Sequence, residues 1–316
     1  VYLLNDTKNF WGTGNLKYGF KFIAVHVDQY ETQAEVDARN HSKDPDDPSV
    51  FLNDIKNFSD LAAAGAGGFM GVLRMDVDHL GAIFSLGIAP EKRSLARVAG
   101  LSSSIDLFFT GYLQHLCQHG PFQERAETPK FRKQSYIAYS GGDDLFILGA
   151  WDVMVELAWQ VRQDFKAFTC DNKDLNISGG VFLCKGKYPV SQAAERAKYL
   201  LDDLAKENAQ QEYDVEARRA SEQSQFLPTM PQRNAIALFN HRLSWENFGE
   251  LKTVGDTLIR AIRGKRLHRV HLYKILDLHN TWRRYRSLNT ARMYYCLLYT
   301  SPSPRDRTRS RMPSSA

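Results

Sequence analysis

The sequence predicts an α+β fold in which a ferredoxin-like domain is followed by a small helical domain. Three observations support this prediction. Between residues 69 and 206, short apolar segments of strand length alternate with segments whose apolar residues recur every three or four positions. Two of the short segments are joined by Ser140-Gly-Gly-Asp-Asp144, and two glycines between apolar runs predict a tight hairpin. Between residues 233 and 295 only the helical spacing occurs.

The composition is that of a globular protein. The chain has 316 residues, 43% of them hydrophobic and 24% charged, which is enough for two domains of ordinary size. Collagen-like, wholly disordered and small disulfide-framework proteins are therefore excluded. The sequence shows neither a long apolar run that would span a membrane nor a secretory leader, so we expect a cytoplasmic protein without membrane contact.

The two ends of the chain differ from its middle in amino-acid composition. Residues 1–66 combine an acidic, proline-punctuated stretch with an alanine and glycine tract, and we interpret them as the end of a preceding module and a linker. Residues 297–316 are rich in Ser, Pro and Arg without apolar periodicity, and we expect them to be a non-native tail. The net charge of +5 comes from this end of the chain, since residues 282–316 hold eight arginines and one aspartate.

The elements of the ferredoxin-like domain follow one another with little interruption. From their apolar spacing we predict, in order, strand 69–75, helix 94–117, strand 135–139, strand 145–148, helix 153–165, strand 175–183 and helix 191–206. Asp152 stands where it would cap the second helix. The order is a split β-α-β arrangement with one additional helix, which is typical of palm domains of the polymerase and GGDEF type. We therefore predict a palm domain over residues 67–227 and a helical domain over residues 228–296.

Acidic residues stand at two strand ends of this predicted palm. Asp76 follows the first strand, and Asp143 and Asp144 lie in the hairpin whose second strand pairs with it in a ferredoxin-like sheet. We therefore expect these carboxylates to meet in space. Beside the small Gly141 and Gly142, they form a hard-oxygen site suited to Mg²⁺ or Mn²⁺. Two such ions activate a 3′-hydroxyl and stabilise the leaving pyrophosphate, which is nucleotidyl transfer. A structural turn rich in Gly and Asp is the alternative interpretation.

A phosphate-binding element is also expected directly after the first strand. The backbone N–H groups of His79, Leu80 and Gly81 are candidates for a nest that would bind phosphate oxygens. A simple glycine turn explains the same residues equally well, so both interpretations stay open.

Five motifs in register give the chain a specific resemblance. They are Gly71-Val-Leu-Arg-Met-Asp-Val-Asp-His-Leu-Gly81, the Phe108-Phe109 helix, Tyr139-Ser-Gly-Gly-Asp-Asp-Leu145, Gly149-Ala-Trp-Asp152 and Ser178-Gly-Gly180. Together they resemble the second palm domain, with its GGDD motif, of the large subunit of type III CRISPR effector complexes. The Csm-type (III-A) branch fits best. The resemblance is close over about residues 67–207 and looser on either side.

This resemblance implies an enzyme of antiviral defence. Such enzymes convert ATP into cyclic oligoadenylates, using Mg²⁺ or a similar ion, when their complex binds target RNA. By position, Asp143 and Asp144 would be the catalytic pair, Asp76 would share the metal ions, and Lys206 would contact phosphate. Three residues of the hairpin would line the nucleotide: Ser140, Gly141 and Gly142. The implied partners are the guide-RNA-containing subunits of the complex and the target RNA.

The resemblance also implies further domains. The family's His-Asp nuclease domain and first palm domain are expected to precede this chain, and the first palm would complete a pocket for two ATP molecules. This chain by itself would then supply only half of that pocket. One departure from the family pattern is Glu207-Asn-Ala-Gln210, where related palms often carry a glycine-basic-Asn turn.

Two other functions remain as alternatives. A diguanylate-cyclase-like enzyme has the same topology and metal chemistry, but Leu145 stands where its motif has Phe, and no Arg-x-x-Asp precedes Ser140. A non-catalytic scaffold subunit of an RNA-guided complex would use the palm only as structure. The intact set of Asp76, Asp143 and Asp144 argues against a degenerate palm.

Overall fold

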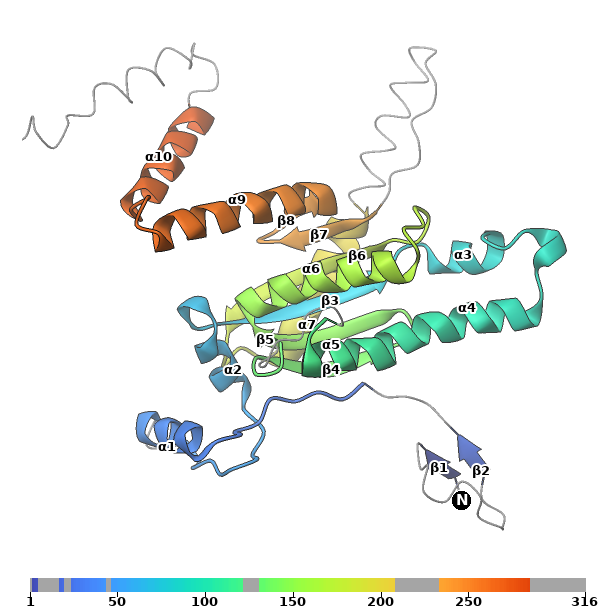
Figure 1. The fold of residues 1–316 in the computed structure, drawn as a ribbon, viewed down its shortest axis with the longest axis horizontal. Coiled ribbons are helices and arrows are strands. Elements are labelled where there is room, and N and C mark those ends of the chain that lie inside the picture. The colour runs from blue at the N-terminus through green and yellow to red at the C-terminus, as the bar shows by residue number, and fades with distance from the viewer. Residues whose placement is uncertain are drawn as a thin grey trace, which may run out of the picture. The chain divides into compact units, whose positions relative to one another are not determined.

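The structure is a computed structural model. The residues that it describes are 2–4, 17–19, 24–43, 47–121, 131–207 and 233–284. The chain divides into two compact units, Val1–Phe248 and Gly249–Ala316, and the first is built on a six-stranded sheet with the strand order β4-β5-β3-β6-β7-β8 (Figure 1). The predicted tail, residues 297–316, lies outside the described residues.

Four strands form the centre of this sheet. They are β3 (Phe69–Val77), β4 (Ser135–Gly141), β5 (Asp144–Ala150) and β6 (Ile177–Lys185). β3 lies between β5 and β6, and every pair in the order β4-β5-β3-β6 is antiparallel. This is the strand order of a split β-α-β domain, so the predicted α+β fold with a ferredoxin-like palm is confirmed.

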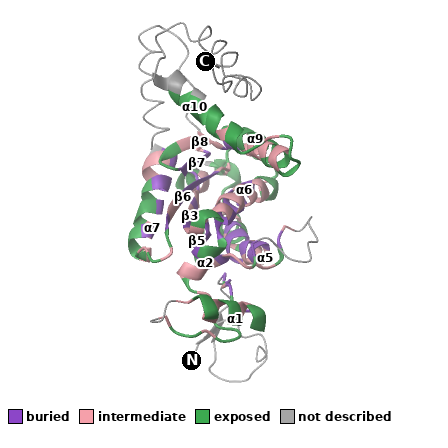
Figure 2. Cartoon of the chain, turned by 90° about the vertical axis from the view of Figure 1, so that its left-hand side faces the viewer, coloured by how far each residue is buried: buried purple, intermediate pink, exposed green. Residues whose placement is uncertain are grey.

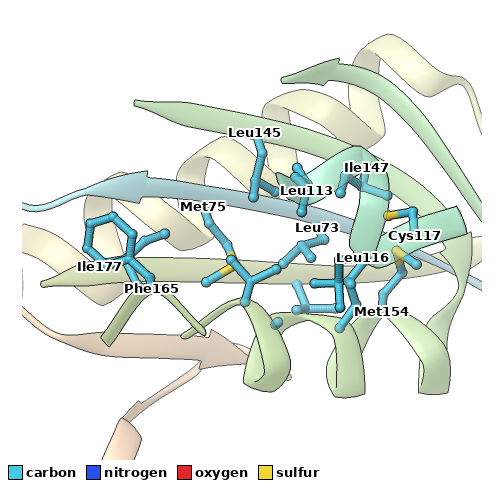
Figure 3. Packing of buried hydrophobic residues seen from close by; sticks show 14 of the residues in the cluster. Leu73, Met75, Leu113, Leu116, Cys117, Leu145, Ile147, Met154, Phe165 and Ile177 are labelled. Carbon is cyan, nitrogen blue, oxygen red and sulfur yellow. The ribbon is translucent and has the colours of Figure 1, made fainter. Parts of the chain in front are cut away.

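One face of the sheet is covered by two long helical segments. The first runs without a break through α4 (Leu95–Leu107), a π-helical segment η3 (Phe108–Tyr112) and α5 (Leu113–His119), and the second is α6 (Trp151–Phe168). Their apolar side chains interdigitate with those of the strands; Figure 3 shows Leu73 of β3 among them. The predicted helix over 94–117 is thus confirmed.

The opposite face is covered by α2 (Phe58–Ala64) and α7 (Val190–Tyr199), and α7 continues into a second π-helical segment, η4 (Leu200–Glu207). Met70 and Val72 of β3 pack on this side, because successive side chains of a strand point to opposite faces. Figure 2 shows the central strands largely buried between the helices. The predicted third helix is confirmed, with a change of winding halfway along it.

Glycines in the strands allow the helices to approach closely. A Cβ atom on Gly180 of β6 would lie 2.7 Å from the N of Leu201 and 2.8 Å from the O of Ala197. A Cβ on Gly71 of β3 would lie 2.7 Å from the Cα of Trp151. Both distances are too short for a side chain, so glycine at these positions sets how near α7, η4 and α6 lie to the sheet.

The expected helix cap at Asp152 is wrong. Helix α6 begins at Trp151, its N-cap is Ala150, and no side chain caps it. Because β5 ends at Ala150, the strand runs straight into the helix and leaves no residue between them for a cap. Asp152 lies in the first helical turn, where a carboxylate is favoured by the helix dipole.

The expectation that residues 233–295 are helical throughout is wrong at the start of this range. β7 (Ala235–Leu238) and β8 (His241–Ser244) form a hairpin, and β7 pairs in parallel with β6. The two turn residues, Phe239 and Asn240, both have positive φ. Strands of four residues are too short to show a clear alternation, and the pairing of β7 with β6 is not local in sequence, so the apolar pattern did not reveal them.

The helical prediction holds for the rest of this range as far as residue 284. α9 (Trp245–Arg263) and α10 (Val270–Arg284) follow the hairpin. No helix among the described residues is long and apolar enough to cross a membrane. The remaining described elements are β1 (Tyr2–Leu4), β2 (Lys17–Gly19), α1 (Gln33–Ser42), η1 (Ala66–Gly68), α3 (Leu80–Leu86) and η2 (Pro90–Lys92).

Candidate functional site

Two of the predicted site carboxylates lie opposite each other on adjacent strands. The antiparallel register of β3 and β5 pairs Asp76 with Asp144. Side chains at directly opposite positions of such a pair have Cβ atoms about 4.5–5.5 Å apart. The structure therefore brings together, at one end of the sheet, carboxylates that are far apart in the sequence, as the apolar pattern predicted.

Asp143 lies in the tight turn between β4 and β5. The turn has two residues, Gly142 and Asp143, and Gly142 has a φ of 70°. A positive φ at the first turn position is characteristic of a type II′ turn and favours glycine there. The backbone O of Asp143 accepts a hydrogen bond of 3.1 Å from the N–H of Val77, which fixes the turn over the end of β3.

The turn is also held by the long helix. Asp106, near the end of α4, accepts a hydrogen bond of 2.9 Å from the N–H of Gly142 through its Oδ1. The hydroxyl of Ser140 donates a hydrogen bond of 2.6 Å to the backbone O of Phe109 in η3. The Ser140 hydroxyl is thus directed toward the helix. Its predicted contact with nucleotide, like those of Gly141 and Gly142, stays a prediction, although the space around the Gly142 Cα is open.

Lys206 reaches this cluster from η4. Its ammonium forms an ion pair with Oδ2 of Asp76, and the residue is 7% exposed. The family resemblance implies a phosphate contact for Lys206; in this structure its partner is the carboxylate. Gly180 makes the contact geometrically accessible, because it allows η4 to lie close to β6.

The site shifts the acidity of its own carboxylates. Burial raises the pKa of Asp76, and the Lys206 ammonium opposes the rise. Burial also raises the pKa of Asp144, the charge of Asp76 adds to the rise, and Arg74 counteracts it. Nη2 of Arg74 lies 3.8 Å from Oδ2 of Asp144. Two carboxylates held this close, each with a raised pKa, are stabilised in their ionised form by a cation.

The donor set fits a hard divalent cation completed by substrate. No three His, Cys, Asp or Glu side chains in the described residues are close enough together to hold a metal ion. However, Mg²⁺ is typically bound through one or two carboxylates plus substrate phosphates, with water as the remaining ligands. Asp76 and Asp144 supply two carboxylates of this kind, and Asp143 is close enough for its charge to raise the pKa of Asp76.

The predicted amide nest lies at the start of α3. His79 has a left-handed backbone conformation, with φ of 55° and ψ of 31°, and is the N-cap of this helix. The N–H groups of Leu80 and Gly81 fall in the first helical turn, where no carbonyl of the helix can accept them. A role of these groups in phosphate binding stays a prediction.

Asp78, the other carboxylate after β3, is part of the fold. It is 2% exposed, and its Oδ2 accepts hydrogen bonds of 2.9 Å from the Ser178 hydroxyl and from the N–H of Asn234. Asn234 directly precedes β7, so Asp78 ties the end of β3 to the start of the hairpin. Burial raises its pKa.

Three residues near the site were not found from the sequence. Arg74 lies two positions before Asp76 and so shares its face of β3, a signal that strand alternation could have given. Tyr139, which is 52% exposed, donates a hydrogen bond of 3.2 Å to the O of Gly141. Asp106 is 36 positions away from the turn that it contacts, and no local pattern indicates that contact.

The antiparallel ferredoxin-like sheet, with carboxylates at adjacent strand ends and a two-residue turn within the GGDD sequence, defines the class of this domain as a palm. Residues 69–213 match the family model described as Cas10/Cmr2, second palm domain. This part of the chain is therefore a palm domain of the Cas10/Cmr2 second-palm type.

Curated relatives support the same family. A protein of Methanocaldococcus jannaschii named CRISPR system single-strand-specific deoxyribonuclease Cas10/Csm1 (subtype III-A) is 33% identical over 56% of this chain and 20% of its own length. The protein of the same name from Enterococcus italicus is 30% identical over 74% of this chain and 26% of its own length. The chain thus spans about a fifth to a quarter of these relatives.

Solved structures share the fold. A Csm1-Csm4 cassette in complex with cA4 matches with a TM-score of 0.63 and 21% identity, over 95% of this chain and 38% of the other. A Csm1-Csm4 cassette in complex with one ATP matches with a TM-score of 0.61 and 22% identity, over 95% and 38% of the two chains. At this identity the likeness concerns the fold alone.

Proposed function

We propose that this chain is the nucleotidyl-transferring palm of a type III CRISPR large subunit, which makes cyclic oligoadenylates from ATP when its complex binds target RNA. The observation that carries the proposal is the pairing of Asp76 with Asp144 at the strand ends, beneath the GGDD turn. The descriptions of the structural neighbours, which name ATP and cA4 as bound molecules, are consistent with it.

In the proposed reaction, the 3′-oxygen of one ATP attacks the α-phosphorus of another. A phosphodiester bond forms, pyrophosphate leaves, and the hydroxyl proton is released; a final attack within the chain of adenylates closes the ring. A divalent cation such as Mg²⁺ or Mn²⁺, when bound, would lower the pKa of the 3′-hydroxyl and neutralise charge on the phosphates. Asp76 and Asp144 would hold it, with Asp143 nearby.

The other residues of the site would bind and orient the nucleotide. The Lys206 ammonium would donate to oxygens of the triphosphate, as cations at phosphoryl-transfer sites do. The open space at Gly142 would let a ligand approach the backbone of the turn. Asp106 and Ser140 would hold that turn still through their hydrogen bonds. Subunits carrying the guide RNA, and the target RNA, are the proposed partners.

The test uses the full-length parent protein, assembled with its partner subunits, guide RNA and target RNA. The complex is incubated with ATP and Mg²⁺, and the products are identified by mass spectrometry. We expect adenylate rings from the wild type and their loss in the Asp143→Ala, Asp144→Ala double variant, with complex assembly intact. The exposed Asp174 provides a matched control, since Asp174→Ala should leave the yield unchanged.

Other outcomes of this experiment decide between functions. An unchanged yield in the double variant would remove Asp143 and Asp144 from the catalytic site. A parallel incubation replaces ATP by GTP. A ring product formed from GTP but not from ATP would indicate a diguanylate-cyclase-like enzyme. No product from the wild type, with binding of target RNA preserved, would identify the palm as a scaffold.

A further inference from the structure

A buried lysine forms an ion pair with a carboxylate that the proposed metal site needs as a ligand. Lys206 is 7% exposed, and its ammonium contacts Oδ2 of Asp76. Asp76 also pairs with Asp144 across β3 and β5, so the ammonium is the cation nearest to one side of this carboxylate pair in the structure. The proposed function gives Lys206 a phosphate as its partner. The structure shows a different partner for the same atom.

We propose that Lys206 is a built-in counter-ion that holds Asp76 in the nucleotide-free palm, so that a divalent cation and the lysine compete for this carboxylate. A bound triphosphate would end this competition. Its phosphate oxygens would become the partner of the ammonium, and Asp76 would be left to the metal ion. Loading of metal and loading of nucleotide would then be coupled through one side chain. This inference rests on the carboxylate site of the proposed function, and does not depend on which product the enzyme makes.

Electrostatics makes the competition strong. An ammonium and a divalent cation at the same carboxylate repel each other, and the repulsion is larger in a partly buried site than in water. The side chain of Asp76 is 26% exposed, and that of Lys206 8% exposed, so water screens this pair only in part. A free carboxylate at Asp76, by contrast, would be left without a nearby cation and would attract one.

The backbone that carries Lys206 is held in place, so the proposed exchange involves the side chain alone. Ala205, the residue before it, is fully buried, and its backbone O accepts a hydrogen bond of 3.3 Å from Nε of Arg242 on β8. Gly180 leaves room for η4 directly on β6. The anchored backbone therefore carries an ammonium on a flexible four-carbon chain, which can exchange one anion for another within its reach.

The first test is Mn²⁺ binding to the 316-residue chain without nucleotide, measured by the electron paramagnetic resonance signal of free Mn²⁺. We expect Lys206→Met to bind Mn²⁺ at least about tenfold more tightly than the wild type, because the competing charge is gone. Lys206→Arg, which keeps the charge, should behave like the wild type. Lys198→Met removes an exposed lysine from α7 and serves as the matched control. Binding that survives Asp76→Asn is subtracted as belonging to other sites.

A second measurement needs no variant. Acetic anhydride labels accessible lysines, and peptide mass spectrometry gives the labelling of each one. In the wild-type chain, added Mn²⁺ should increase the labelling of Lys206, because the metal displaces it from Asp76, and should leave that of the exposed Lys198 unchanged. This readout decides the question even if Lys206→Met fails to fold.

The outcomes separate this inference from the proposed function. Equal Mn²⁺ affinities for the wild type and Lys206→Met, or labelling of Lys206 that does not respond to Mn²⁺, would overturn the competition. Mn²⁺ binding that never depends on Asp76 would overturn the metal site and the proposed function with it. The expected Mn²⁺ pattern, combined with no nucleotide product from the assembled complex, would count against the proposed function alone and support the competition.

Discussion

Asp76 and Asp78 stand two positions apart where β3 ends, but their surroundings differ in kind. Asp78 is 2% exposed, and its donors are neutral groups, the Ser178 hydroxyl and the N–H of Asn234, each at 2.9 Å. The side chain of Asp76 is 26% exposed, and its partner is the Lys206 ammonium. Burial raises the pKa of both carboxyls.

The difference separates a carboxylate that holds the fold from one that is available to a ligand. The donors of Asp78 belong to the rigid ends of β6 and β7, so they cannot leave without disrupting the sheet. The cation beside Asp76 is the ammonium of a side chain, which holds no element of the sheet together, and its exchange for another cation is the inference proposed above. A sequence motif of two aspartates therefore does not imply two equivalent ligands, and the neighbouring strands decide which is which.

The largest effect on stability should come from removing the structural carboxylate. Asp78→Ala leaves a buried hydroxyl and a buried N–H without an acceptor, and we expect it to lower the free energy of unfolding by about 3 kcal/mol. Asp76→Asn keeps a neutral acceptor for Lys206 and should cost less, about 1–2 kcal/mol. Urea unfolding of the two variants checks this contrast. Equal losses would show that the two aspartates play the same structural role.

A smaller effect is expected from the glycine that brings η4 to the sheet. Gly180→Ala places a Cβ within 2.7 Å of the N of Leu201, so the segment carrying Lys206 must move outward. We expect a loss of about 2 kcal/mol in urea unfolding, as for other overpacked sites. The Mn²⁺ affinity without nucleotide should rise at the same time, because Lys206 moves away from Asp76.

Gly255 offers the control for this variant. It lies within α9, and no atom lies within 4 Å of a Cβ added there. Gly255→Ala should therefore be neutral or stabilise the helix by up to about 1 kcal/mol. If Gly180→Ala were as well tolerated as Gly255→Ala, the close approach of η4 would not be what positions Lys206.

The last prediction concerns a second fully buried carboxylate, which has a lysine partner but lies away from the strand ends. Asp28 is 3% exposed, its Oδ2 lies 3.0 Å from Nζ of Lys56, and burial raises its pKa from 3.8 to about 6. The folded protein then binds more protons than the unfolded chain between about pH 4 and pH 6. The contribution of Asp28 to stability therefore falls as the pH rises through this window.

The direction of this pH dependence can be measured by comparison with a variant in which residue 28 does not titrate. Between pH 4 and pH 6.5, the free energy of unfolding of Asp28→Asn should improve relative to the wild type by up to about 2 kcal/mol. A relative change in the opposite direction would mean that the charged pair with Lys56 outweighs burial.

Part of the fold follows from local pattern alone. The helix of residues 94–117 shows its apolar face at steps of three or four, and the two glycines before Asp143 and Asp144 specify the hairpin. The apolar pattern does not reveal β7 and β8, since each has four residues and β7 joins the sheet through β6, more than fifty positions earlier in the chain. The Asp152 cap was misplaced, since the strand before it runs two residues further than its apolar core.

The sequence by itself determined the class of fold, the end of the sheet at which acidic residues gather, and the order of the elements, because each of these depends on short-range spacing. Only the tertiary structure decided how the individual side chains are used. It paired Asp76 with Asp144, assigned Asp78 to the hairpin, placed Asp106 against the turn and set Lys206 on a carboxylate. These contacts join residues that are 36 to 156 positions apart, and packing between layers, rather than local propensity, brings such residues together.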